Sequence, residues 1–432
     1  MDYQQSRAYV KDADRYAGGA LDLTNIKELM KRLGNPQDQL KYVHVAGTNG
    51  KGSVIAYLYT TLSEAGYRVG RYISPSVYSY REKMEVAGSA VSREQFAGYV
   101  TRVAAAIKEM TTEGLAHPTP FEIETAVAFL FFAEEKCDLV ILEVGMGGNL
   151  DATNIIRNTV LAVLVPISMD HQAFLGNTLS EIAEKKAGII KPGCSVVTVG
   201  QQPETMAVIE RVCRENGADL TEADLHEAKA VKEDFAGQTL EYRGENYELA
   251  LAGSYQTGNA ALALEALEVL GRVGYPTTVE QRKKGLKDTK WNGRLTIIHR
   301  EPLFIVDGAH NPAAADMLED SVRKYFKGRK LFFIMGVFRD KDYPYIIRKL
   351  CPYAEQIITI ETPDNPRALP AQELAEEVKK CNPHVQAADS IPDAVDKIFA
   401  MAGREDVILS FGSLSFIGEI TTIVKTQEEK NS

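Results

Sequence analysis

The sequence has few residues of the kinds that cross-link a chain or anchor it in a membrane. Its 432 residues include five cysteines, which are widely spread and form no C-x-x-C pair. This pattern argues against a disulfide framework and against zinc sites, and it indicates reduced thiols. No stretch approaches the roughly 20 apolar residues that a membrane-spanning helix needs. The first residues are polar and lack the apolar core of a signal peptide, so we expect a cytoplasmic protein without a membrane partner.

The sequence also lacks an excess of positive charge. Its 49 Lys and Arg residues stand against 59 Asp and Glu residues, which gives a net charge of −10. This balance argues against nucleic acid as a partner. An anionic substrate must then be attracted by a local group of lysines, arginines, helix N-termini or a metal ion.

The length of the chain exceeds that of a single ordinary core and predicts two domains. A lone Trp, an Asn-Gly pair and an Arg lie between a polar helix end and a new strand, at residues 291–294. We place the boundary there, which gives domains of residues 1–293 and 294–432.

The most informative stretch is residues 41–53, KYVHVAGTNGKGS, an apolar run followed by glycines around a lysine and by a hydroxyl residue. Glycines let backbone N–H groups turn toward an anion, Lys51 adds a positive charge, and Ser53 can offer its hydroxyl to magnesium. The usual template G-x-x-x-x-G-K-[ST] would put glycine at Val45 and a hydroxyl residue at Gly52, so an empty glycine-rich turn is the alternative. We expect ATP, held by Gly47, Thr48, Asn49, Gly50, Lys51, Gly52 and Ser53.

The pattern around this loop predicts an α/β fold. A helical pattern at 53–64 and a strand pattern at 68–73 complete a strand, loop, helix and strand unit, and the last third of the chain also alternates strands with helices. We therefore expect a P-loop-type mononucleotide-binding N-terminal domain plus a smaller Rossmann-like α/β C-terminal domain.

Other stretches give weaker signals of secondary structure. Residues 74–92 lack periodicity and predict a long surface loop. Residues from about 195 to 251 predict shorter strands, with a hairpin at 239–249. Capping-box spacings predict three helix starts, at Ser92, Thr119 and Thr178.

Polar residues follow two strands that are predicted to be buried. Glu143 comes after the apolar run of strand 139–144, and Asp170 and His171 follow strand 159–167. Because parallel α/β sheets bind ligands at the carboxyl ends of their strands, we expect these side chains near the phosphate loop. Glu143 suits magnesium, which prefers oxygen ligands, whereas His171 is equally well explained as an ordinary loop histidine.

The roles of two further groups of residues cannot be decided from their spacing alone. Lys185 and Lys186, in EKKAGIIKPG, would ordinarily form a solvated helix face. Asp307 and His310, in DGAHNP, follow a strand of the second domain, where Asn311 and Pro312 are explained as a helix N-cap and first turn. The motifs at 340–342 (DKD) and 411–414 (FGSL) follow other strands of the second domain and are either ordinary loop residues or site residues.

Several motifs together go beyond a generic α/β pattern. GTNGKGS, the SPS…YREKMEVAGS loop, FEIETAVAF, LEVGMGGNLDATN, DHQAFLGNTLSEIAEKKAGIIKPG, NGR, DGAHNP and FGSL occur in this order. The sequence thereby closely resembles the folylpolyglutamate synthase/dihydrofolate synthase family from about residue 20 to residue 420. This family belongs with the Mur ligases among the ATP-dependent amide-forming ligases.

The resemblance implies roles for individual residues. Lys51 and the loop glycines would hold the ATP phosphates, with Ser53 next to Mg²⁺. Ser74, Glu143 and His171 match magnesium-ligating positions of the family, and Lys186 matches a lysine that is carbamylated in relatives and becomes a carboxylate-like ligand. The resemblance further assigns nucleotide contacts to Asn259 and Arg294, and a place near ATP and the incoming glutamate to Asp307 and His310. It implies that residues 1–293 bind ATP and folate and that residues 294–432 contribute to the binding of glutamate and ATP.

The implied activity is ATP-dependent ligation of L-glutamate to a folate carboxylate, through an acyl phosphate, by a monomeric enzyme of folate biosynthesis and polyglutamylation. The sequence departs from the family pattern near the expected site at Ser76, Asn149, Tyr255 and Asn292. These departures leave open whether dihydropteroate, a reduced folate or both are substrates. The alternatives are a Mur-type ligase that adds an amino acid to a UDP-sugar peptide, and a catalytically silent nucleotide-binding relative.

Overall fold

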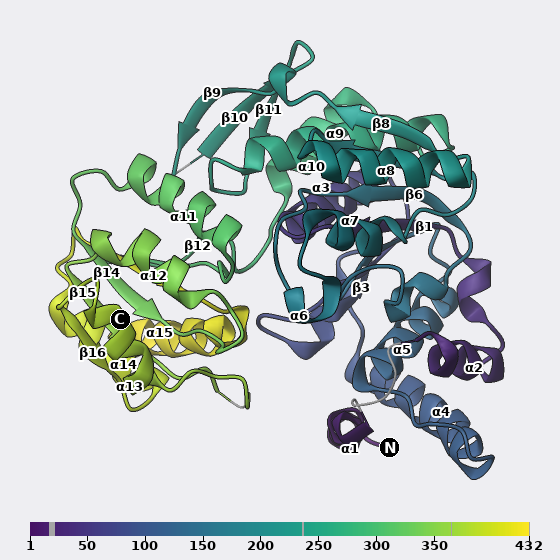
Figure 1. The fold of residues 1–432 in the computed structure, drawn as a ribbon, viewed down its shortest axis with the longest axis horizontal. Coiled ribbons are helices and arrows are strands. Elements are labelled where there is room, and N and C mark those ends of the chain that lie inside the picture. The colour runs from purple at the N-terminus through teal and green to yellow at the C-terminus, as the bar shows by residue number, and fades with distance from the viewer. Residues whose placement is uncertain (17–21, 236, 364, 432) are drawn as a thin grey trace. The chain divides into compact units, whose positions relative to one another are not determined.

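The computed structural model describes residues 1–16, 22–235, 237–363 and 365–431 (Figure 1). Contacts within the chain divide it into two compact units. Unit 1 contains residues 1–76, 80–228 and 258–288, and unit 2 contains residues 77–79, 229–257 and 289–432. Residues 229–257 thus group with unit 2, whereas the single boundary near Gly293 stays a prediction.

Unit 1 is built on an eight-stranded sheet, in the order β4-β3-β2-β5-β1-β6-β7-β8. The pairs from β2 to β8 are parallel, and β3 and β4 add antiparallel edge strands. The strands are β1 Tyr42–Ala46, β2 Val69–Tyr72, β3 Met84–Val86, β4 Ser89–Ala90, β5 Leu139–Glu143, β6 Thr159–Leu164, β7 Ser195–Val199 and β8 Asp219–Ala223. The expectation that residues 74–92 form only a surface loop is wrong, because β3 pairs with β2. This pairing joins segments that are apart in the sequence, so the local pattern of apolar residues does not predict it.

Helices cover both faces of this sheet. The helices of unit 1 are α1 Tyr3–Asp12, α2 Thr24–Arg32, α3 Lys51–Glu64, α4 Arg93–Thr112, α5 Pro120–Glu134, α6 Gln172–Leu175, α7 Leu179–Ala187, α8 Pro203–Asn216, α9 Gln256–Arg272 and α10 Val279–Asp288. The capping boxes at Ser92, Thr119 and Thr178 are confirmed, since each side chain accepts a hydrogen bond from the third helical residue. Helix α8 lies where only shorter strands were expected.

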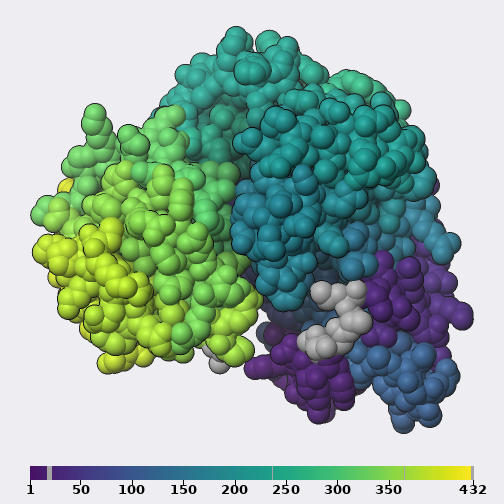
Figure 2. Space-filling view, in the orientation of Figure 1, coloured from purple at the N-terminus to yellow at the C-terminus, as the bar shows by residue number. Residues whose placement is uncertain are grey.

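Two apolar layers of the core of unit 1 lie side by side on one face of the sheet, because Tyr42 of the first layer and Ala46 of the second point to the same side of β1. One layer joins the sheet to α4 and α5, with Tyr42, Tyr72, Phe129 and Phe132 fully buried. The other joins it to α7 and α8. Helix α5 contacts α1, α2 and α4, and the purple N-terminal residues lie directly against the blue residues of α4 in Figure 2.

Unit 2 contains a six-stranded sheet in the order β12-β13-β17-β14-β15-β16 and an antiparallel sheet β11-β10-β9. The six-stranded sheet is parallel except for β12. The strands are β9 Lys229–Asp234, β10 Gly237–Tyr242, β11 Glu245–Leu249, β12 Thr296–Arg300, β13 Leu303–Val306, β14 Leu331–Met335, β15 Gln356–Thr359, β16 Val385–Ala387 and β17 Val407–Phe411. The hairpin predicted at 239–249 is confirmed as β10 and β11.

Five helices of unit 2 pack on the six-stranded sheet and give one apolar core on each of its faces. They are α11 Pro312–Tyr325, α12 Tyr343–Leu350, α13 Ala371–Lys379, α14 Ile391–Met401 and α15 Ile417–Asn431. The two units together confirm the predicted α/β fold class. Among the helices of the described residues, none is long and apolar enough to cross a membrane.

Candidate active site

The phosphate loop joins the carboxyl end of β1 to the first turn of α3. Gly47 has a φ of +140° and Gly50 has a φ of +101°, a backbone region that favours glycine. A Cβ atom on Gly47 would lie 2.2 Å from Cγ2 of Val165, and one on Gly50 would lie 2.6 Å from Oδ1 of Asn259. The loop therefore requires glycine at both positions, and Asn259 of α9 lies directly beside it.

The loop is tied to the segment that follows β6. The N–H of Thr48 donates to the carbonyl of Pro166 at 2.9 Å. The Thr48 hydroxyl lies 3.1 Å from the carbonyl oxygen of Ser168 and 3.0 Å from its N–H. Lys51 folds back over the loop, where Nζ donates to the carbonyl oxygens of Gly47 and Thr48 at 3.3 and 3.2 Å. Cationic and N–H donors are thus gathered around one backbone turn at a helix start, an arrangement suited to phosphate.

Lys186 comes from α7 to the same turn. Its Nζ donates to the carbonyl oxygen of Gly47 at 2.8 Å, and the side chain is buried. Burial and, to a smaller extent, repulsion by Lys51 lower the pKa of Lys186 to about 7, although Asp170 and Asp151 act in the opposite direction. A large fraction of Lys186 is therefore a neutral amine at neutral pH, unlike a solvated lysine.

Glu143 and Ser74 lie at the carboxyl ends of the neighbouring strands. Glu143 is the last residue of β5 and pairs in register with Val45 of β1, two residues before the loop begins. It is buried, and its Oε2 accepts the N–H of Ser74 at 3.1 Å. Ser53 is buried in the first turn of α3. The expected convergence of Glu143 on the rim of the phosphate loop is therefore confirmed.

His171 follows β6 and precedes the short helix α6. Its φ is +50°, in the left-handed region, and its Nε2 lies 3.8 Å from Oδ2 of Asp170. Within the described residues, no three His, Cys, Asp or Glu side chains form a group that could hold a metal ion. The expected ligand set contains only two residues of these types, Glu143 and His171, so a magnesium site would need the hydroxyls of Ser53 and Ser74 and a modified Lys186.

Asp151 was not among the predicted site residues, although it belongs to the LDATN motif that signals the family. It is buried, its Oδ2 accepts the N–H of Met146 at 2.9 Å, and its Oδ1 accepts the N–H of Thr153 at 3.0 Å. Burial raises its pKa, while these hydrogen bonds lower it. Asp151 therefore holds the glycine-rich turn after β5 in place and also lies near Lys186.

A second group of predicted residues meets in unit 2. Asp307 is buried at the end of β13, where Oδ2 accepts the N–H of Leu295 at 2.9 Å and Oδ1 accepts the N–H of Ala309 at 2.8 Å. Burial raises the pKa of Asp307, and Arg294 opposes this rise. His310 Nδ1 lies 2.8 Å from the carbonyl oxygen of Gly308. A Cβ on Gly308 would lie 2.5 Å from a guanidinium nitrogen of Arg294. Arg294, Asp307, Gly308 and His310 therefore form one compact cluster, which we call the Asp307 cluster.

The two other motifs of unit 2 have structural explanations. Asp340 forms an ion pair with Arg367 at 2.7 Å, and Asp342 caps α12 by accepting the N–H of Tyr345. In FGSL, Phe411 is the buried end of β17 and Ser413 caps a short 3₁₀ helix. Leu414 packs where a Gly308 side chain would otherwise lie, at 2.3 Å from the Cβ position. The DKD motif is therefore explained by an ion pair and a helix cap within its loop. The FGSL motif supports the Asp307 cluster by packing.

Comparison with known protein families defines the class of protein. Residues 45–267 match the Mur ligase middle domain, and residues 293–414 match the glutamate ligase domain of the Mur ligases. The first of these ranges includes the phosphate loop of this chain, and the second includes its six-stranded sheet.

Comparison with individual proteins narrows this class. The chain is 35% identical over 434 residues to the dihydrofolate synthase/folylpolyglutamate synthase of Bacillus subtilis, covering 98% of this chain and 99% of that protein. The structure of Mycobacterium tuberculosis folylpolyglutamate synthase complexed with ADP aligns with a TM-score of 0.88 at 31% identity, over 98% of this chain and 99% of that one. The structure of a complex of folylpolyglutamate synthase (FPGS) with AMPPCP and folate aligns with a TM-score of 0.84 at 28% identity, over 97% of this chain and 98% of that one. The chain belongs to the folylpolyglutamate synthase/dihydrofolate synthase family of ATP-dependent ligases, which confirms the family and reaction type expected from the sequence.

Proposed function

We propose that this chain joins L-glutamate to a folate carboxylate through an acyl phosphate. A carboxylate oxygen of the folate attacks the γ-phosphorus of ATP, the bond to the bridging β–γ oxygen breaks, and ADP leaves. The glutamate amine then attacks the acyl carbon, inorganic phosphate leaves, the amine loses a proton, and an amide remains. The observation that carries this proposal is the phosphate loop with Lys51 and Lys186 both donating to Gly47, beside the buried carboxylate of Glu143.

The protein contributes position and charge to both steps. Gly47–Ser53 would bind the ATP phosphates by backbone N–H groups, and Lys51 would turn from its carbonyl acceptors to the negatively charged oxygens. Asn259, which lies against Gly50, would contact the nucleotide. In unit 2, Arg294 would also contact the nucleotide, and Asp307 and His310 would contact ATP and the incoming glutamate.

A magnesium ion would be held by Ser53, Ser74, Glu143 and His171, a donor set rich in the oxygen atoms that Mg²⁺ prefers. When bound, the ion neutralises negative charge on the phosphates. Glu143 supports this assignment because it is a carboxylate buried at a strand end, where an opposing positive charge lowers the cost of burial.

Lys186 is proposed to carry a carbamate. The neutral amine attacks the carbon of CO₂, forms a C–N bond and loses a proton, which leaves a negatively charged carbamate. Only a neutral amine reacts, and the lowered pKa of about 7 supplies that form near neutral pH. Carbon NMR of the protein equilibrated with isotope-labelled bicarbonate should show a carbamate signal that Lys186→Gln removes. Persistence of the signal in that variant would refute the assignment.

The reaction is tested by folate- and glutamate-dependent ADP release. Lys51→Ala should lower turnover by about a hundredfold or more, since one cation aimed at the transferred phosphate is lost. Lys108→Ala is the matched control, because Lys108 is an exposed residue of α4. Turnover of Lys51→Ala equal to that of the control would contradict the proposal, and absence of ATP consumption in the unaltered protein would favour a silent relative.

The folate substrate is the least defined part of the proposal. We expect a reduced folate to be accepted, and dihydropteroate to be accepted if the chain has both activities of its family. Purified protein should be given ATP, magnesium and glutamate with dihydropteroate or tetrahydrofolate in separate reactions. Mass spectrometry of the products then shows which substrate gains a glutamate and how many are added.

A further inference from the structure

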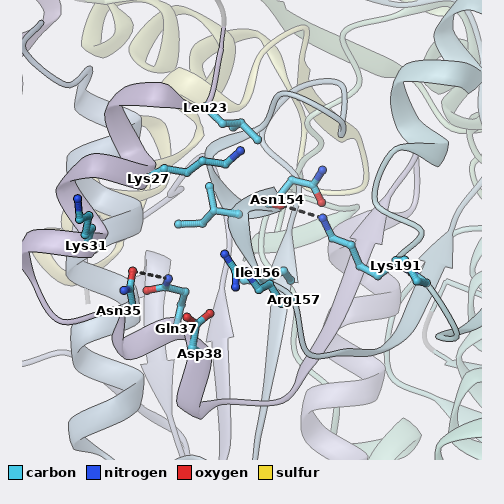
Figure 3. A pocket seen from close by; sticks show the side chains of 12 residues that line it. Leu23, Lys27, Lys31, Asn35, Gln37, Asp38, Asn154, Ile156, Arg157 and Lys191 are labelled. Atoms are coloured by element: carbon cyan, nitrogen blue, oxygen red, sulfur yellow. Dashed lines mark hydrogen bonds between the residues drawn. The ribbon is translucent and has the colours of Figure 1, made fainter.

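A second basic region of unit 1 lies away from the phosphate loop. It is a pocket of about 750 Å³, which is within the size range of small-molecule sites. Its wall contains the cations Lys27, Lys31, Arg157 and Lys191 and a single carboxylate, Asp38. We call it the Lys27–Lys191 pocket (Figure 3).

The pocket lies at the amino ends of the central strands. Asp38 precedes β1, Arg157 precedes β6 and Lys191 precedes β7. The phosphate loop lies at the opposite, carboxyl end of β1, and five strand residues at a rise of about 3.3 Å separate the two edges by roughly 16 Å. A ligand in this pocket is therefore separate from the nucleotide.

The cations converge on one space from different elements. Lys27 extends from α2 and Lys191 extends from the opposite wall, and Arg157 points into the space between them (Figure 3). Lys191 Nζ donates to the carbonyl oxygen of Asn154 at 2.9 Å, which fixes its direction and uses one of its three N–H donors. Burial and the nearby charge of Lys27 lower the pKa of Lys191 to about 8.

Few carboxylates neutralise the positive charges of this pocket. In the part of the chain that the structure describes, Lys31 pairs loosely with Glu28 at 3.9 Å. Among the described residues, Lys27 interacts electrostatically with the exposed Asp22 but forms no ion pair within 4.0 Å, and neither do Arg157 and Lys191. Four cations and one carboxylate leave the wall with three net positive charges. Such a concentration in a chain of net charge −10 creates a local field that attracts anions.

We propose that the Lys27–Lys191 pocket binds a small polyanion that carries two or more phosphate or carboxylate groups. A polyanion places one charged group between Lys27 and Lys191 and another near Arg157, and so relieves the repulsion among these cations. Charge-assisted hydrogen bonds from lysine and arginine would hold both groups. The proposal does not depend on the ligase reaction.

Isothermal titration calorimetry of the full chain tests this site, with tripolyphosphate as the phosphate probe and γ-linked triglutamate as the carboxylate probe. Saturating magnesium and ADP are present so that neither probe binds at the nucleotide loop. We expect saturable binding of at least one probe, with an affinity that falls as salt is added. Binding of tripolyphosphate alone or of triglutamate alone identifies the phosphate or carboxylate source, and binding of both identifies a general polyanion site.

Variants assign the binding to this pocket. The double variant Lys27→Gln/Lys191→Gln should raise the Kd by about tenfold or more, and Lys27→Gln alone should raise it severalfold. Lys27→Gln removes no hydrogen bond seen in the structure, and an unchanged melting temperature will show that it folds. Lys108→Gln, an exposed lysine on α4, should leave the Kd within about twofold. Absence of saturable heat with either probe, or equal affinity in Lys27→Gln and Lys108→Gln, would overturn the proposal.

Discussion

Gly47→Ala is the substitution whose effect the structure predicts most directly. The φ of +140° at this position is strained for any residue with a Cβ, at a cost of about 1–3 kcal/mol. The added methyl group would also lie 2.2 Å from Cγ2 of Val165 and 2.6 Å from its carbonyl oxygen. The second neighbour is backbone of the segment after β6 and cannot rotate away, so overpacking adds about 1–3 kcal/mol.

The two effects together should lower the free energy of unfolding by roughly 2–6 kcal/mol. A loop that moves to avoid the clash also displaces the Gly47 carbonyl, the common acceptor of Lys51 and Lys186. We therefore expect weaker ADP binding together with lower stability, measured by calorimetric titration and by urea denaturation.

Gly66→Ala is the matched control for Gly47→Ala. Gly66 follows the other end of α3, has a φ of +89°, and has no atom within 4 Å of the Cβ position. This control should lose only about 1–2 kcal/mol from backbone strain and should bind ADP normally. If Gly47→Ala matches Gly66→Ala in both stability and ADP affinity, the steric account of the loop is wrong.

Three further predictions concern stability. The lowered pKa of Lys186, about 7 against about 10.4 in an unfolded chain, means that the free energy of unfolding should rise with pH across that window; in CO₂-free buffer Lys186→Met should flatten the rise by a few kcal/mol in urea titrations. Burial lowers the pKa of His44 to about 3, so stability should fall as the pH drops from about 6.5 toward 3, and His44→Gln should make this acid loss shallower. Thr119→Ala removes a helix cap and should cost about 1 kcal/mol, whereas Thr112→Ala, at the exposed end of α4, should cost less.

Much of the fold and of the phosphate loop could be predicted because the signals are local. The capping boxes at Ser92, Thr119 and Thr178 each lie within four consecutive residues, and the loop follows its strand directly. Helix α8 lacks a capping box, since its N-cap residue is Gln202, whose side chain makes no capping hydrogen bond, and its start is marked by the weaker signals of Pro203 and Glu204 in the first turn. Without a capping box, the apolar residues of this segment resembled those of short strands.

The surroundings of Lys186 and the Lys27–Lys191 pocket could not be predicted from spacing. The acceptor of Lys186 is a backbone carbonyl 139 residues away, and only the packing of α7 on the sheet brings the two together. Likewise, Lys27 of helix α2, Arg157 before β6 and Lys191 before β7 belong to three separate segments that meet at the amino ends of the central strands. Family resemblance identified Lys186, but no linear pattern identifies a pocket assembled from distant cations.

Strand β1 lies between β5 and β6 within the eight-stranded sheet, and all five of its residues are buried. Its amide hydrogens should therefore exchange with solvent only when unit 1 opens globally, whereas those of the adjoining loop can exchange through local opening. The change from slow to fast exchange should fall within one or two residues, at Ala46 and Gly47. Nucleotide binding should then slow exchange most strongly on the loop side of this junction, which makes the end of β1 an internal reference against which ligand-induced ordering of the loop can be measured.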